Sequence, residues 1–147
     1  MAIIARSEML IRAPARAVFR AFVQPAWLEK FWLKKASAPL QPGQEVHWEF
    51  LVPGAHERVE VRHLIENEHI AFNWSGGKSV DIRLAKFGRG TRVAVEVTGF
   101  RGKDAASEAM DATKGFTVVQ CDLKSLLERG VSGGMVRDAA RLIAANK

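Results

Sequence analysis

Few side chains of this chain are placed to make or break bonds. Its four histidines are scattered, and its single cysteine, Cys121, can form neither an internal disulfide nor a cysteine-based zinc site. We expect His63 and Glu57 to face inward from one strand, but six positions at roughly 3.3 Å each separate them by about 20 Å. Because they cannot share a proton, we expect no catalytic residue, no metal and no cofactor.

Aromatic residues provide a candidate site of another kind, one that could hold an apolar molecule. They recur at alternate positions of the predicted strands, with large aliphatic residues beside them. Three polar residues interrupt this apolar surface and would orient a ligand through hydrogen bonds. The predicted ligand-binding residues are Trp32, Trp48, Phe50, Val61, His63, Phe72, Trp74, Ile82, Val95, Thr113, Phe116 and Gln120. The alternative, in which these side chains simply fill a core, stays open.

Residues 45–99 carry most of this set. Apolar and polar residues alternate there between short turn signals, which is typical of an antiparallel meander. Turn signals fall at residues 53–54, 67–68, 75–79 and 88–89. The registers that follow pair Trp48 with Val59, His63 with Phe72, Phe72 with Ile82 and Ile82 with Val95. They predict one continuous apolar face and an opposite face of alternating acids and bases.

The apolar face needs a cover, and residues 104–129 provide one. Their apolar residues recur at three- and four-residue steps, which predicts a long helix that ends at Gly130. The predicted inward stripe is Ala106, Met110, Thr113, Phe116, Gln120, Leu123 and Leu127. Gly115 costs this helix about 1 kcal/mol relative to alanine, which predicts a close approach to another segment there.

The rest of the chain completes the element order. We expect strands over residues 3–12 and 35–40, short helices that begin after Pro14 and at Pro25, and a tail helix over residues 135–146. A strand, two small helices, a meander and a long helix is the order of elements in a helix-grip fold.

Short segments strengthen this interpretation through their order and spacing. They are Ile11–Ala15 with Val18-Phe19 and Ala21-Phe22, Phe31-Trp32, Ile70–Trp74, Gly90–Val93 with Gly99-Phe100, and Gly115-Phe116 with Leu123–Gly130. Together they resemble the family related to the C-terminal domain of the heat-shock protein 90 ATPase activator. This family belongs to the START and birch-pollen-allergen superfamily, also called SRPBCC, and the resemblance spans residues 3–130.

The resemblance implies an α+β helix-grip fold. A curved antiparallel sheet of about seven strands would wrap around the long helix, with two short helices after the first strand and an extra tail helix. It also implies a cavity between sheet and helix that holds lipids, flavonoids or polyketides. We expect residues 1–130 to form this domain and residues 131–147 to add the tail helix to it.

Length, charge and hydropathy limit the functional classes. The 147 residues suit one domain, and the net charge of +6, dispersed among acids, indicates mainly solubility rather than nucleic-acid binding. No apolar run reaches the roughly 20 residues that span a bilayer, and no signal peptide begins the chain, so we expect a cytoplasmic protein.

We predict binding or carriage of a small hydrophobic molecule without catalysis. The alternatives are a co-chaperone or stress-response protein with a chaperone or a second copy as partner, and a cyclase-like enzyme.

Overall fold

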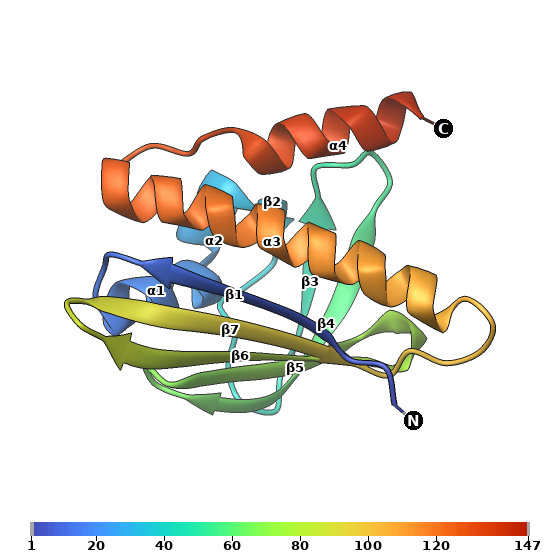
Figure 1. Ribbon diagram of the computed structural model, residues 1–147, viewed down its shortest axis with the longest axis horizontal. Helices are drawn as coiled ribbons and strands as arrows, with labels where there is room; N and C mark the ends of the chain where they lie inside the picture. The colour runs from blue at the N-terminus through green and yellow to red at the C-terminus, as the bar shows by residue number, and fades with distance from the viewer. Residues whose placement is uncertain (1, 147) are drawn as a thin grey trace.

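A seven-stranded antiparallel sheet curves around one long helix (Figure 1). The computed structural model describes residues 2–146. The strands are β1 (Ala5–Ile11), β2 (Leu33–Ala36), β3 (Glu45–Phe50), β4 (His56–Ile65), β5 (His69–Trp74), β6 (Lys78–Phe87) and β7 (Gly90–Thr98). The helices are α1 (Ala15–Val23), α2 (Pro25–Phe31), α3 (Ala105–Arg129) and α4 (Met135–Ala145), with a 3-10 turn η1 (Ser75–Gly77).

The strands lie in the order β1-β7-β6-β5-β4-β3-β2, so the first strand pairs with the last. α1 lies at the end of the sheet where β6 turns into β7, and α4 lies on the side of α3 that faces away from the sheet (Figure 1). This is the predicted α+β helix-grip fold, which the structure confirms. No helix within residues 2–146 combines the length and hydrophobicity needed to cross a membrane.

Local sequence explains where the helices begin and end. Pro14 precedes α1 in an extended conformation, and Pro25 occupies the first turn of α2, where its missing N–H leaves no hydrogen bond unmade. Gly130 ends α3 in the left-handed region at φ 81° and donates its N–H to the Leu126 carbonyl. The predicted end of the long helix is therefore confirmed.

The predicted strand registers are right in one hairpin and shifted in two others. Ile82 pairs with Val95 as predicted. Trp48 pairs with Glu57 instead of Val59, because four residues, 51–54, separate Phe50 from its partner Ala55, where the prediction had a turn of two. Phe72 likewise pairs with Val80 instead of Ile82. Both errors are slips by two residues, which by themselves leave each side chain on its predicted face.

The β4–β5 register contains a different error, which moves His63 to the other face of the sheet. Phe72 pairs with Val61, but the next pair on the turn side is His63 with Ala71, so Arg62 is an extra residue in β4. This β-bulge reverses the alternation beyond it. His63 is exposed beside His69, at 5.1 Å between ring centroids, and Leu64 packs against the core in its place. The predicted inward position of His63 is therefore wrong.

The predicted stripe of α3 is also shifted at its start. Met110 is 72% exposed, and Ala106 is exposed as well, whereas Ala105 and Ala109 are buried. From Phe116 onward the predicted stripe is correct, with Gln120 and Leu123 fully buried against the sheet. The helix thus covers the apolar face as expected, but with its first turns rotated by one residue.

Candidate functional site

An apolar pocket of about 590 Å³ lies between α3, α4 and the tip of the β3–β4 hairpin. Its lining comes from segments far apart in the sequence, namely the end of α2, the hairpin, the last residue of β5 and both C-terminal helices. The lining residues are Trp32, Phe50, Leu51, Val52, Ala55, Trp74, Asp111, Ala112, Lys114, Gly115, Phe116, Val118, Val119, Val136, Ala139, Ala140 and Ile143. Asp111 and Lys114 are the charged members of this lining, and both are exposed.

Four aromatic rings fix one another in the wall of this pocket. Phe116 stacks on Trp74 with ring centroids 5.9 Å apart and meets Trp32 edge-on at 5.7 Å. Phe50 meets Trp74 edge-on at 6.1 Å. Offset and edge-on contacts at these distances are the favourable arrangements of aromatic pairs. The rings therefore form a pre-positioned apolar surface.

Gly115 widens the pocket on the α3 side. A Cβ atom built at this position would meet no atom within 4 Å outside the helix backbone. The predicted close approach of α3 to another segment is therefore wrong. The missing side chain instead leaves open space above the rings.

α4 forms the opposite wall and is held by a carboxylate that the sequence analysis did not single out. Asp122 of α3 is 1% exposed. It accepts hydrogen bonds from Ser132 Oγ and the Gly133 N–H through Oδ1, and from the Val136 N–H through Oδ2. The carboxylate thus caps the N-terminus of α4 from the neighbouring helix, where the helix dipole favours negative charge.

The predicted site residues separate into groups. Four line the pocket, namely Trp32, Phe50, Trp74 and Phe116. Five lie in the core and are at most 2% exposed, namely Trp48, Val61, Phe72, Ile82 and Val95. Thr113 donates to the Ala109 carbonyl, and Gln120 accepts from Ser7 Oγ and donates to the Val93 carbonyl. His63 lies on the outer face of the sheet, away from all of these.

The centre of the predicted cavity is therefore occupied by core side chains, and the open space lies beside α3. The pocket residues that we did not predict come from the hairpin tip and from α4. Leu51 and Val52 next to the Pro53-Gly54 turn, and the apolar side of α4, were visible signals. What the sequence did not show is that these two segments meet.

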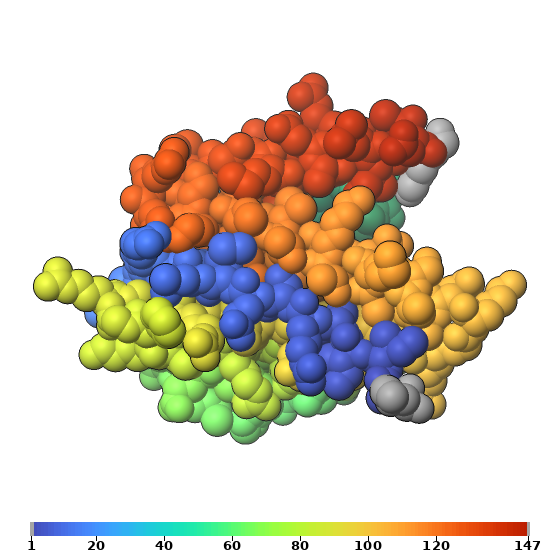
Figure 2. Space-filling model, viewed as in Figure 1, coloured from blue at the N-terminus to red at the C-terminus, as the bar shows by residue number. Residues whose placement is uncertain are grey.

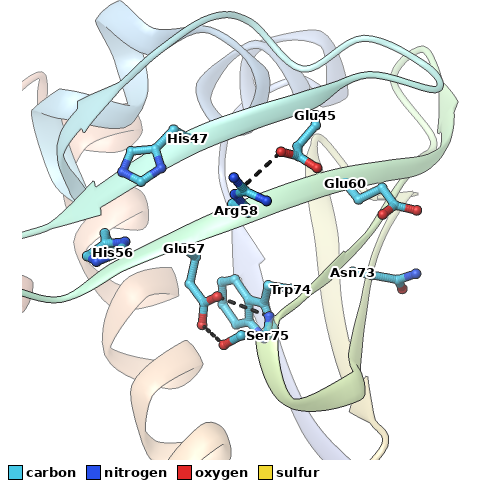
Figure 3. Close-up of a pocket in the computed structure, with 9 residues that line it drawn as sticks. All are labelled: Glu45, His47, His56, Glu57, Arg58, Glu60, Asn73, Trp74 and Ser75. Atoms are coloured by element: carbon cyan, nitrogen blue, oxygen red, sulfur yellow. Dashed lines mark hydrogen bonds and ion pairs between the residues drawn. The ribbon is translucent and has the colours of Figure 1, made fainter.

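A second depression, of about 540 Å³, lies on the outer face of β3, β4 and β5 and is polar (Figure 3). Arg58 pairs with Glu45 at 3.7 Å, and His47 faces His56 with ring centroids 5.2 Å apart. Glu57, which we expected to face the interior, accepts hydrogen bonds here from the Ser75 N–H at 3.0 Å and from Ser75 Oγ at 2.9 Å. Through these two hydrogen bonds, Glu57 fixes the position of the turn after β5. Within residues 2–146, no cluster of three or more His, Cys, Asp or Glu residues is arranged to hold a metal.

Glu128 ties β1 to the end of α3. Its Oε2 accepts hydrogen bonds from Lys124 Nζ and from the Arg12 N–H, both at 2.7 Å. Lys124 Nζ also donates to the Leu10 carbonyl at 2.7 Å. Burial acts to raise the pKa of Glu128, but the hydrogen bonds and positive charges of Lys124 and Arg12 outweigh it, so this pKa lies below its ordinary value.

We expect Glu128 to make folding stability sensitive to acid. Its folded pKa lies below the pKa of the same carboxyl in the unfolded chain, so the unfolded chain binds the proton more readily. The stabilisation is complete above the unfolded pKa and is lost as the pH falls through the folded pKa. At neutral pH, Glu128→Gln should lower the free energy of unfolding by about 1–2 kcal/mol. Urea unfolding as a function of pH should show this difference vanish in acid, and a pH-independent difference would contradict the prediction.

The fold and the pocket together define a helix-grip protein with an apolar pocket beside its long helix. Residues 12–128 match the family described as activator of Hsp90 ATPase homolog 1-like protein, and the chain belongs to this family. The predicted family, within the SRPBCC superfamily, is thereby confirmed. α4, which forms one wall of the pocket, lies beyond the matched residues.

Solved structures share the fold. SSP2350 from Staphylococcus saprophyticus is 25% identical with a TM-score of 0.80, and the match covers 88% of this chain and 95% of that one. DynU16, from the dynemicin biosynthetic locus, is 22% identical with a TM-score of 0.78 over 88% of this chain and 48% of that one. The Aha1 dimer from Colwellia psychrerythraea is 19% identical with a TM-score of 0.76 over 86% and 96%. None of the curated proteins matches this sequence.

Proposed function

We propose that the chain binds a small apolar molecule in the pocket between α3, α4 and the β3–β4 hairpin. The observation that carries the proposal is the pocket of about 590 Å³ with four aromatic rings in its wall. Pockets for small ligands are typically about 300–1,000 Å³ and mainly apolar. This supports a ligand of the lipid, flavonoid or polyketide kind.

The lining also limits the chemistry of the ligand. A polar group that is buried without a hydrogen-bond partner costs about 1–3 kcal/mol. The charged lining residues, Asp111 and Lys114, are exposed, so the pocket offers a ligand charged partners only at its rim. The buried part of the ligand should therefore be hydrocarbon or aromatic, and any polar group should remain at the rim. The proposal includes no catalytic step.

The environment-sensitive dye anilinonaphthalene sulfonate can test this proposal. We expect saturable dye fluorescence with energy transfer from tryptophan, since Trp32 and Trp74 line the pocket. Ile143→Glu should weaken dye binding about tenfold, because it removes an apolar contact and adds a charge to the wall. Leu142→Glu is the matched control, since Leu142 is 67% exposed on the same helix and does not line the pocket. Unsaturable dye fluorescence, or equal loss in both variants, would overturn the proposal.

A second candidate function is self-association through α4. Met135 and Leu142 of α4 are 40% and 67% exposed, and the similar fold from Colwellia psychrerythraea is a dimer. Sedimentation of the wild type over a range of concentrations would show a dimer, and Leu142→Glu should return it to a monomer. A wild-type monomer at every concentration would remove this candidate.

A further inference from the structure

Three segments that carry basic residues meet at the end of the molecule where β6 turns into β7 (Figure 1). A Cβ atom at Gly90 would lie 2.6 Å from the Ile11 carbonyl oxygen, so this turn touches the junction of β1 and α1. The Arg12 N–H donates to Glu128 at 2.7 Å, which brings the end of α3 to the same junction. In Figure 2 the β6–β7 turn projects in yellow beside the blue of the β1–α1 junction.

We call this surface the basic end and define it by its charged residues. The basic residues are Arg12, Arg16, Lys86, Arg89, Arg92, Lys124 and Arg129. The acidic residues among them are Glu8, which lines a shallow depression with Arg92, and Glu128. Seven basic and two acidic residues leave an excess of five positive charges, and an excess of three where Glu66 and Glu68 of the adjoining turn between β4 and β5 are included.

Most of these cations are not neutralised by a neighbour. Among residues 2–146, ion pairs at the basic end involve Arg12 and Lys124, and both go to the same carboxylate of Glu128. Arg16, Lys86, Arg89 and Arg129 are exposed and form no ion pair within the described chain. Glu66 and Glu68 lie in the turn between β4 and β5, at the edge of this surface next to β6.

Apolar side chains stand at the turns of the same end. Phe87 is 50% exposed, with the Arg92 guanidinium 5.2 Å from its ring centroid. Val131, just after α3, is 62% exposed, and Ile65, at the end of β4, is 41% exposed. The surface thus combines unpaired cations with apolar side chains at turns.

We propose that the basic end binds the surface of an anionic lipid bilayer. Lys and Arg close to such a surface are attracted to its negative headgroups, and apolar side chains at turns can enter the boundary between headgroups and acyl chains. A single-stranded nucleic acid would instead need several exposed rings for base stacking. Among the described residues, Phe87 is the only large hydrophobic residue with an exposed aromatic ring. The other exposed large apolar side chains are aliphatic. The basic end shares no residue with the apolar pocket, so this proposal stands independently of the proposed function.

Sedimentation with phosphatidylcholine vesicles, with and without phosphatidylserine, tests the proposal. We expect the chain to bind the vesicles that contain phosphatidylserine and not to bind the neutral vesicles. High salt should dissociate the chain from the anionic vesicles. The double variant Arg16→Glu, Arg89→Glu should reduce binding at least about tenfold. The control Arg101→Glu, Lys103→Glu has the same net charge but lies in the loop at the opposite end of β7, and it should bind nearly as the wild type does.

A second pair of variants tests the apolar part of the surface. Phe87→Ser should weaken binding to the anionic vesicles several-fold, whereas Met110→Ser, at a residue that is 72% exposed on α3, should not. Circular dichroism of each variant verifies that it is folded. Absent vesicle binding, or equal losses in the variants and their controls, would overturn the proposal. Binding to duplex DNA without binding to vesicles would identify a nucleic acid as the partner instead.

Discussion

Replacing Asp122 by alanine is expected to release α4 from α3 and to lower the free energy of unfolding by about 2–4 kcal/mol. The carboxylate is 1% exposed and accepts hydrogen bonds from Ser132 Oγ and from the Gly133 and Val136 N–H groups. A hydrogen bond to a charged acceptor contributes about 1.5–3 kcal/mol. The total loss is smaller than the sum of such bonds, because a detached α4 returns its donors to water.

Hydrogen exchange can locate this effect. In Asp122→Ala the amides of α4 should exchange much faster than in the wild type, while those of β6 and β7 should change little. Asp138→Ala is the control, since Asp138 is exposed in the first turn of the same helix and its loss should cost only about 0.3–1 kcal/mol. Dye binding should also weaken in Asp122→Ala, because α4 supplies Val136 and Ile143 to the pocket. Unchanged exchange in α4 would show that other contacts hold the helix.

The sequence predicted the fold well because its signals were local and repeated. The turn at Gly88-Arg89 placed Ile82 opposite Val95 correctly. Slips by two residues in the β3–β4 and β5–β6 hairpins had no effect on burial, since strand side chains alternate with a period of two. The bulge at Arg62 was different, because one extra residue exchanges the faces beyond it. Its position depends on pairing with β5, and nothing in the alternation around His63 distinguishes the two faces.

The pocket was harder to predict than the fold because tertiary contacts create it. The four aromatic pocket residues were found from their strand and helix positions, but the same reasoning included Trp48 and Phe72, which are fully buried. Whether such rings border a space or fill it depends on where α4 docks. That position is set by Asp122, a carboxylate on the buried side of α3 between Val119 and Leu126. An acidic residue in that place is the signal that could have indicated a structural partner for the tail.

Gly115→Leu is expected to block the pocket while making the protein more stable. Glycine in a helix costs about 0.8–1.0 kcal/mol relative to alanine, and leucine is nearly as good a helix former as alanine. A Cβ atom at Gly115 meets nothing within 4 Å, so the new side chain should fit without strain and occupy space that a ligand would need. Crowding of this kind typically costs about 1–3 kcal/mol, which corresponds to dye binding that is weaker by about fivefold to about 150-fold.

The opposite signs of the two effects are what make this variant informative, because a variant that merely damaged the fold would lose both stability and binding. Gly115→Ala should give the stability gain with little loss of binding, since one methyl group fills little of a pocket of about 590 Å³. Ala106→Leu places the same side chain at an exposed position of α3 outside the pocket and should change neither property appreciably. Thermal unfolding and dye titration of the three variants provide the comparison. If Gly115→Leu binds the dye as tightly as the wild type, the space beside α3 is not where apolar molecules bind.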